Sequence, residues 1–299
     1  MHIKHQDYSK SIVFYLSCIF VLNISFVFAN EYEVRYPQPY NHLKSRDEYF
    51  LTLLRLALEK SKSESEYFLI RPAKEKMEQG RAVMELAKGQ SIDVMWTMTS
   101  KEREGILLPV RIPLLKGLLG YRIFLIREGD ADKFKQVLNL SQLRHFVAGQ
   151  GHDWPDTQIL RASNLPVHTS SNYEGLFSML KARRFDYFPR GINEIWPELD
   201  AHKDQGMVID KYLMLYYPSP IYFFFNPKNA TLARRVEDGL KLAIEDGSFD
   251  RIFFSHPAHK KMFEQVAFDA RTIITLNNPL LPAETPLENR QLWLLPGAH

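Results

Sequence analysis

Strand-like and helix-like segments alternate along most of the sequence, and this alternation limits the fold class more than any other feature. Strand patterns at 32–36, 68–70 and 92–96 are separated by helical patterns at 45–58 and 79–88. The two kinds of segment are distinguished by the period of their apolar residues. Strands that alternate with helices pair in parallel through right-handed crossovers. The sequence therefore predicts an α/β fold with parallel-rich sheets, in which ligands bind beyond the carboxyl ends of the strands.

The alternation starts again after a polar passage at 130–139, which indicates two lobes with a cleft between them. Further strands are predicted at 121–126, 146–148, 166–168, 185–188 and 221–225. The last helix, at 231–246, ends at Gly247, as helices commonly do. The predicted boundaries are a first part of lobe 1 at 30–126, lobe 2 at 127–219, a return to lobe 1 at 220–267 and a C-terminal tail at 268–299.

Residues 1–29 have the layout of a secretory signal peptide. Lys4 and Lys10 precede an uncharged apolar run at 12–28, and Ala29 completes a small-ended cleavage site. The alternative is an uncleaved membrane anchor, because the run approaches the spanning minimum. Either way we expect an exported chain, in a compartment such as a bacterial periplasm. Cys18 is the sole cysteine, so the exported part is not a disulfide scaffold.

Charge and motifs exclude several functional classes. The formal net charge is only +3, without the clustered basic residues that a nucleic-acid-binding protein needs. The sequence contains neither Gly-x-Ser-x-Gly nor His-Glu-x-x-His, so we expect neither an enzyme nor a cofactor. His152, Asp153 and Asp156 could bind a metal in isolation. No other His or Cys stands at a recognisable ligand spacing, so no metal site is expected.

Three segments together carry a resemblance to a known family. The first is DVMWTMTSKER at 93–103, the second is FVAGQG at 146–151, and the third is EDGLKLAIEDGSFDRIF at 237–253. In this order they resemble the periplasmic solute-binding proteins of the polar amino-acid type, over roughly residues 31–266. The resemblance implies the type II fold, which has two lobes joined by two crossovers. It also implies a small-molecule ligand, and we expect a monomer.

The resemblance implies ligand contacts in lobe 1. The family's Arg, which holds the ligand carboxylate, corresponds to Arg103, and the family's threonine contacts correspond to Thr97 or Thr99. Here the second threonine lies one residue further from the arginine than in the family. Tyr40 follows the first strand, where the family often presents an aromatic wall. The alternatives are that Arg103 is a solvated residue at a helix start and that Tyr40 only packs.

In lobe 2 the resemblance implies that Gln150 and Gly151 belong to a turn before a helix whose amino end meets an anionic ligand group. Gly151 could instead serve the turn geometry alone. Members that bind α-amino acids place an Asp at the position of Gly191, so Glu194 would have to substitute for it. Arg190 adds a second cation and suggests a ligand rich in carboxylates. The alternative is a structural ion pair of Arg190 with Glu194 or Asp186.

These observations predict a protein that binds a small polar or acidic solute, such as an amino acid or another carboxylate, by closing its cleft. It would deliver this solute to a membrane importer. One alternative is a ligand sensor that presents its closed form to a membrane receptor. A less favoured alternative is an enzyme on the same fold, with Glu194 and either His152 or His168 as an acid/base pair.

Overall fold

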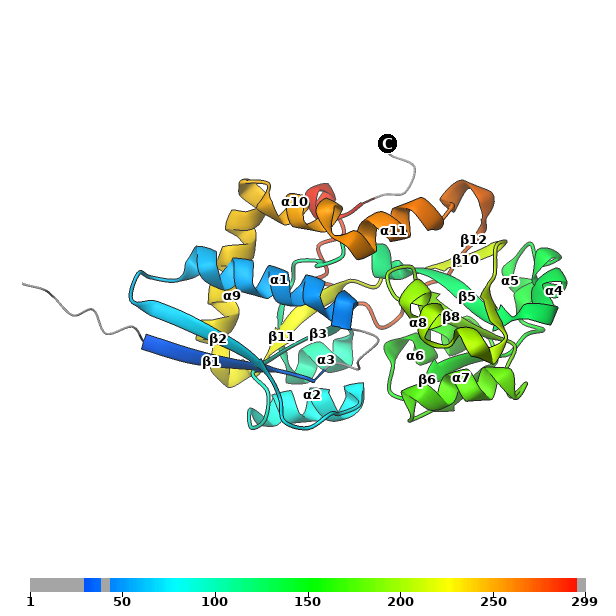
Figure 1. Ribbon diagram of the computed structural model, residues 1–299, viewed down its shortest axis with the longest axis horizontal. Helices are drawn as coiled ribbons and strands as arrows, with labels where there is room; N and C mark the ends of the chain where they lie inside the picture. Colours follow the sequence, from blue (N-terminus) through cyan, green and yellow to red (C-terminus); the bar gives the residue numbers. More distant parts are fainter. Residues whose placement is uncertain (1–29, 39–43, 295–299) are drawn as a thin grey trace, which may run out of the picture.

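The computed structural model describes residues 30–38 and 44–294, which form two halves lying side by side (Figure 1). The predicted signal peptide and Tyr40 lie outside the described residues. Within the described part of the chain, the helices are all too short or too polar to cross a membrane.

The first half combines two small sheets with helices from both ends of the chain. Strands β1 (Asn30–Tyr36) and β2 (Glu66–Pro72) pair in parallel. Strand β11 (Ile221–Phe225) lies between β3 (Val94–Met98) and β4 (Leu108–Val110) and is antiparallel to both. The helices are α1 (Lys44–Ser61), α2 (Gln79–Lys88), α3 (Lys101–Ile106), α9 (Ala230–Glu245) and α10 (Ser248–Ser255).

Helices α1 and α9 of this half cross at a glycine. A Cβ atom on Gly239 would lie 1.8 Å from the carbonyl oxygen of Ala57, so the two backbones touch here. This close approach brings the apolar face of α9 onto α1, where Ala57 and Leu240 are completely buried.

The second half is built on one mixed sheet with the strand order β12-β10-β5-β8-β6-β7, and β9 also pairs with β5. Its strands are β5 (Tyr121–Arg127), β6 (Ala148–Gly151), β7 (Val167–Ser170), β8 (Tyr187–Gly191), β9 (Met207–Ile209), β10 (Leu213–Tyr216) and β12 (Thr272–Thr275). Its helices are α4 (Ala131–Lys135), α5 (Leu140–Leu143), α6 (Pro155–Ala162), α7 (Tyr173–Lys181) and α8 (Ile195–Ala201). Helix α11 (Pro257–Gln265) leads from α10 of the first half toward β12 (Figure 1).

Two segments lie elsewhere than predicted. Strand β5 was assigned to lobe 1, but it pairs with β8 and β10 of the second half and is buried along its whole length. Strand β12 lies within the predicted tail, yet it forms a parallel pair with β10. In both cases pairing over a long sequence separation decides the position, and a local pattern does not show such pairing.

Helix ends were predicted more accurately than strand ends. Helix α2 ends at Gly89 and α9 is followed by Gly247, and both glycines are left-handed, with φ of 68° and 73°. Strand β8 continues through Arg190, which was predicted to lie at the tip beyond the strand. The cap of α7 is Asn172, whose side chain accepts a hydrogen bond from the Gly175 N–H.

The segment that connects β4 to β5 carries an unusual backbone and is held by the end of the chain. Lys116 and Gly117 both have positive φ, 49° and 82°. The ring of Trp293 lies so close to Gly117 that a Cβ there would come within 2.3 Å of it, and the Leu294 N–H donates to the Lys116 carbonyl. The predicted tail is therefore packed against one of the connections between the halves.

Candidate functional site

A cavity of about 180 Å³ lies where the two halves meet, and both halves line it. Its charged and aromatic lining from the first half consists of Asp47, Phe50, Glu78 and Trp96. The second half contributes Arg122, Trp154, Asp156, Tyr173, Arg190 and Glu194. We call this cavity the cleft.

Two arginines on neighbouring strands form the charged wall of the second half. The β5–β8 register places Arg122 opposite Gly191, so Arg122 and Arg190 come from adjacent positions of the sheet. Arg122 Nη2 lies 2.8 Å from Asp156 Oδ1, and its Nη1 lies 3.5 Å from Glu194 Oε2. Arg190 Nη2 lies 3.1 Å from the same Glu194 oxygen. The glutamate thus lies between both guanidinium groups.

Behind this wall, Arg190 is held by a second carboxylate, that of Glu198. Arg190 Nε and Nη2 donate to the two oxygens of Glu198 at 2.7 and 2.6 Å, and the Tyr173 hydroxyl donates at 2.7 Å. Glu198 is fully buried and Arg190 is 4% exposed. Burial alone would lower the pKa of Arg190, but the carboxylates of Glu194 and Glu198 raise it well above its ordinary value.

The sequence left open whether Arg190 faces the cleft or forms an ion pair, and in the structure it does both. Arg190 lines the cleft, and it also pairs with Glu194. Asp186, the other partner considered, pairs with Arg127 at 3.3 Å. Glu198 was missed, although Glu194 and Glu198 stand four residues apart at the start of a helix and so share a face. Because Arg190 is already neutralised, it gives little reason to expect an acidic ligand.

Arg103 is buried beside the cleft and does not line it. Ser100 caps α3 by accepting a hydrogen bond from the Arg103 N–H, which fixes the arginine directly after β3. Arg103 Nη1 donates to Thr97 Oγ1 at 2.6 Å and to the Met98 carbonyl at 2.8 Å. Its Nη2 donates to Gln79 Oε1 at 2.5 Å and to the Asp153 carbonyl at 3.3 Å. Burial lowers the pKa of Arg103 to about 10.

The other predicted site residues are divided between the cleft and its surroundings. Thr97 and Glu194 line the cleft. Thr99 is fully buried and donates to Glu104 at 2.5 Å. Gln150 is fully buried and donates to the Pro189 carbonyl at 3.3 Å. Gly151 packs closely against the Trp154 ring, since a Cβ at this position would lie 2.4 Å from it. Their roles in ligand binding stay predictions.

Arg122 was not predicted as a site residue. Its strand had been assigned to the first half, where this side chain would not have faced Asp156. The one signal in the sequence was a single arginine within the otherwise apolar segment 121–126. Asp156 was considered only as a metal ligand, and its role in the structure is to pair with Arg122 and to accept a hydrogen bond from Tyr217.

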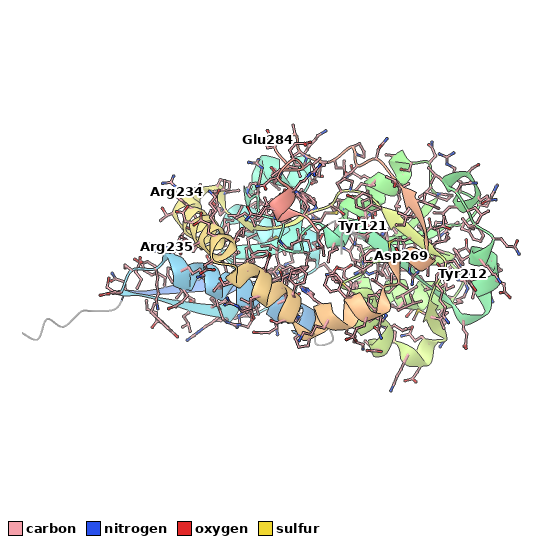
Figure 2. All side chains as sticks on the ribbon, turned by 90° about the horizontal axis from the view of Figure 1, so that it is seen from above. Tyr121, Tyr212, Arg234, Arg235, Asp269 and Glu284 are labelled. Atoms are coloured by element: carbon pink, nitrogen blue, oxygen red, sulfur yellow. The ribbon has the colours of Figure 1, made fainter. Side chains whose placement is uncertain are left out.

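Two other kinds of site find no support in residues 30–38 and 44–294. No group of three His, Cys, Asp or Glu side chains there could hold a metal ion. A second hollow lies on α1 and α9, next to Arg234 and Arg235, on the outer part of the first half (Figure 2). Two of its three basic residues are in ion pairs, because Arg235 pairs with Glu66 and Lys60 pairs with Asp246.

Comparison with known proteins identifies the fold. No family model and no curated protein sequence matches the chain. Among solved structures, an ancestral arginine-binding protein bound to arginine aligns with a TM-score of 0.55 at 15% identity, over 77% of this chain and 99% of that one. A periplasmic His/Glu/Gln/Arg/opine family-binding protein from Silicibacter pomeroyi, in complex with lysine, aligns at 0.55 and 8% identity, over 75% and 95%.

A histidine kinase sensor domain with similarity to periplasmic binding proteins aligns at 0.53 and 13% identity, over 77% of this chain and 97% of that one. These similarities confirm the predicted α/β, two-lobed type II periplasmic-binding fold. At such low identity they establish the fold alone.

Proposed function

We propose that the protein captures a small polar solute in the cleft, closes its two halves around it and delivers it to a membrane importer. The observation that carries this proposal is the cleft itself, a cavity of about 180 Å³ lined by both halves. Pockets for drug-sized ligands have volumes of roughly 300–1,000 Å³. The cleft therefore suits a solute about as large as a single amino acid.

Contacts between the two halves beside the cleft support capture by closure. The Gly80 N–H at the start of α2 donates to Asp153 Oδ2 of the second half at 2.5 Å. Arg103 donates across the same boundary to the Asp153 carbonyl. A solute that contacts both halves binds the closed state better than any open state, so it shifts the population toward closure.

The predicted signal peptide supports a periplasmic location, where an importer would receive the solute. The expected monomer is part of the same proposal. The preference for acidic solutes is not part of it, because Arg122 and Arg190 both have carboxylate partners in the wall of the cleft.

A second candidate is a ligand sensor that presents its closed form to a membrane receptor. It is supported by the similarity in fold to a histidine kinase sensor domain. Binding and closure are common to both candidates, so only the membrane partner distinguishes them. Crosslinking of the loaded protein to the importer or to the receptor decides between the two. The expectation that the chain is not an enzyme stays a prediction, which turnover of a bound solute would contradict.

A thermal-shift screen of the purified protein against small polar solutes tests the proposal, because a solute that binds only the folded state raises the melting temperature. Solutes at 100 times their Kd should add about 2.7 kcal/mol of stability. Gln38→Trp places a large ring in the lining of the cleft and should abolish the shift. Gln90→Trp, at an exposed position away from the cleft, is the matched control and should keep it.

The proposal fails if amino acids, amines, carboxylates, peptides and sugar acids all leave the melting temperature unchanged. It also fails if the two tryptophan variants respond equally to an active solute.

A further inference from the structure

Two groups of the first half that could bind a carboxylate beside the cleft, the Arg103 guanidinium and the Gly80 N–H, already have partners within the protein. Arg103 donates to four acceptors, from Thr97, Met98, Gln79 and Asp153. The first N–H groups of a helix have no acceptor within the helix. The Gly80 N–H, near the start of α2, is such a group and donates to the Asp153 carboxylate. A Cβ on residue 80 would lie 2.2 Å from that carboxylate oxygen, so any other residue would force the Asp153 side chain to shift.

Gln79 lies between Arg103 and the cleft. Gln79 belongs to the cleft lining, whereas the arginine that donates to its side chain does not. Its Oε1 atom is 2.5 Å from Arg103 Nη2, the position that a ligand carboxylate oxygen would need in order to bind this guanidinium. The glutamine amide therefore takes the place of a ligand oxygen on Arg103.

The charges that do line the cleft favour a cation. Among the described lining residues, the carboxylates of Asp47, Glu78, Asp156 and Glu194 outnumber the guanidinium groups of Arg122 and Arg190. Asp156 and Glu194 are themselves partners of these arginines, but four carboxylates against two guanidinium groups still give the described lining a formal charge of −2.

The aromatic lining favours the same kind of ligand. Trp96 from the first half and Trp154 and Tyr173 from the second half line the cleft. Indole and phenol faces attract cations and pack against alkyl chains, and the Arg190 guanidinium already lies 4.7 Å from the ring centroid of Trp154 and 5.9 Å from that of Tyr173.

We propose that the cleft selects a small organic amine without a carboxylate, and that Gln79 is the specificity-determining residue that keeps a carboxylate away from Arg103. This inference rests on the proposed function, since it names the ligand class of the same cleft. It requires no chemical step, only that the ammonium end of the ligand meets the carboxylates of the lining.

Titration calorimetry with matched pairs of solutes tests the inference. Cadaverine and agmatine are lysine and arginine without the α-carboxylate, so each pair differs only in the group under test. We expect each amine to bind the unaltered protein at least tenfold more tightly than its parent amino acid. Gln79→Ala removes the amide from Arg103, so it should strengthen lysine and arginine binding at least tenfold and reduce the preference for amines.

Two further variants control for indirect effects. Gln90→Ala makes the same substitution at an exposed position away from the cleft and should leave the ratio of amine to amino-acid affinity unchanged. Gln79→Glu keeps an acceptor on Arg103 and should still exclude the amino acids. Melting temperatures of all variants show whether each one is folded.

The outcomes separate this inference from the proposed function. Tighter binding of lysine or arginine than of the amines by the unaltered protein overturns the inference and leaves the proposed function standing. An unchanged affinity ratio in folded Gln79→Ala overturns the role of Gln79. If neither the four compounds nor any other solute of the broader screen binds, the proposed function fails and the inference fails with it.

Discussion

Replacement of Glu198 by glutamine should strongly destabilise the second half. The change keeps the volume of the side chain but removes the charge that holds Arg190 through two hydrogen bonds of 2.7 and 2.6 Å. Loss of one partner of a buried ion pair costs about 3–5 kcal/mol, since the other charge stays buried. Glu194 still lies 3.1 Å from Arg190, so we expect the lower end, about 3 kcal/mol.

Urea unfolding followed by circular dichroism measures this cost. With a slope of about 3 kcal/mol per molar urea, the midpoint should fall by about 1 M. Asp200→Asn is the matched control on the same helix, because its pair with Lys261 is exposed and should be worth less than about 1 kcal/mol. Equal midpoints for the two variants would show that Arg190 does not depend on Glu198.

Two further predictions concern stability alone. Gly239→Ala should lower the free energy of unfolding by several kcal/mol, because its Cβ would meet the Ala57 carbonyl at 1.8 Å. Gly105→Ala, with nothing within 4 Å, should stabilise helix α3 by about 0.5–1 kcal/mol. Thermal unfolding of both variants checks the contrast. Burial lowers the pKa of His259 to about 4, so between pH 6.5 and 4 the unfolded chain binds more protons than the folded protein. The folded state therefore loses up to about 3 kcal/mol of stability as the pH falls through this range, and none of it is lost above pH 6.5. Urea unfolding at several pH values should show a shallower acid loss in His259→Phe, and identical profiles would refute the assignment.

The fold was predictable because its signals are local. Helical apolar spacing and the glycines at 89 and 247 determine helix ends through backbone conformation alone, and the structure agrees. The positions of β5 and β12 were not predictable from such signals. Each strand is placed by pairing with β10, which follows β5 by more than eighty residues in the chain and precedes β12 by more than fifty.

The site was predictable only in part, for the same reason. The resemblance to the family pointed to Thr97 and Arg190 as cleft residues, and both line the cleft. The pairing of Arg190 with Glu198 and the cover that Gln79 forms over Arg103 depend on side chains that meet only after folding. A motif that names an arginine does not show which acceptors surround it.

The most direct test of capture in the cleft is the distance between the two halves with and without a solute that raises the melting temperature. Cys18 is the sole cysteine, so Cys18→Ser combined with Met84→Cys on α2 and Ser178→Cys on α7 leaves two exposed sites for spin labels, one in each half. Pulsed electron paramagnetic resonance should then show a shift to shorter distances and a narrower distribution as the solute is added. A distribution that stays the same at saturating solute would contradict binding by closure of the cleft.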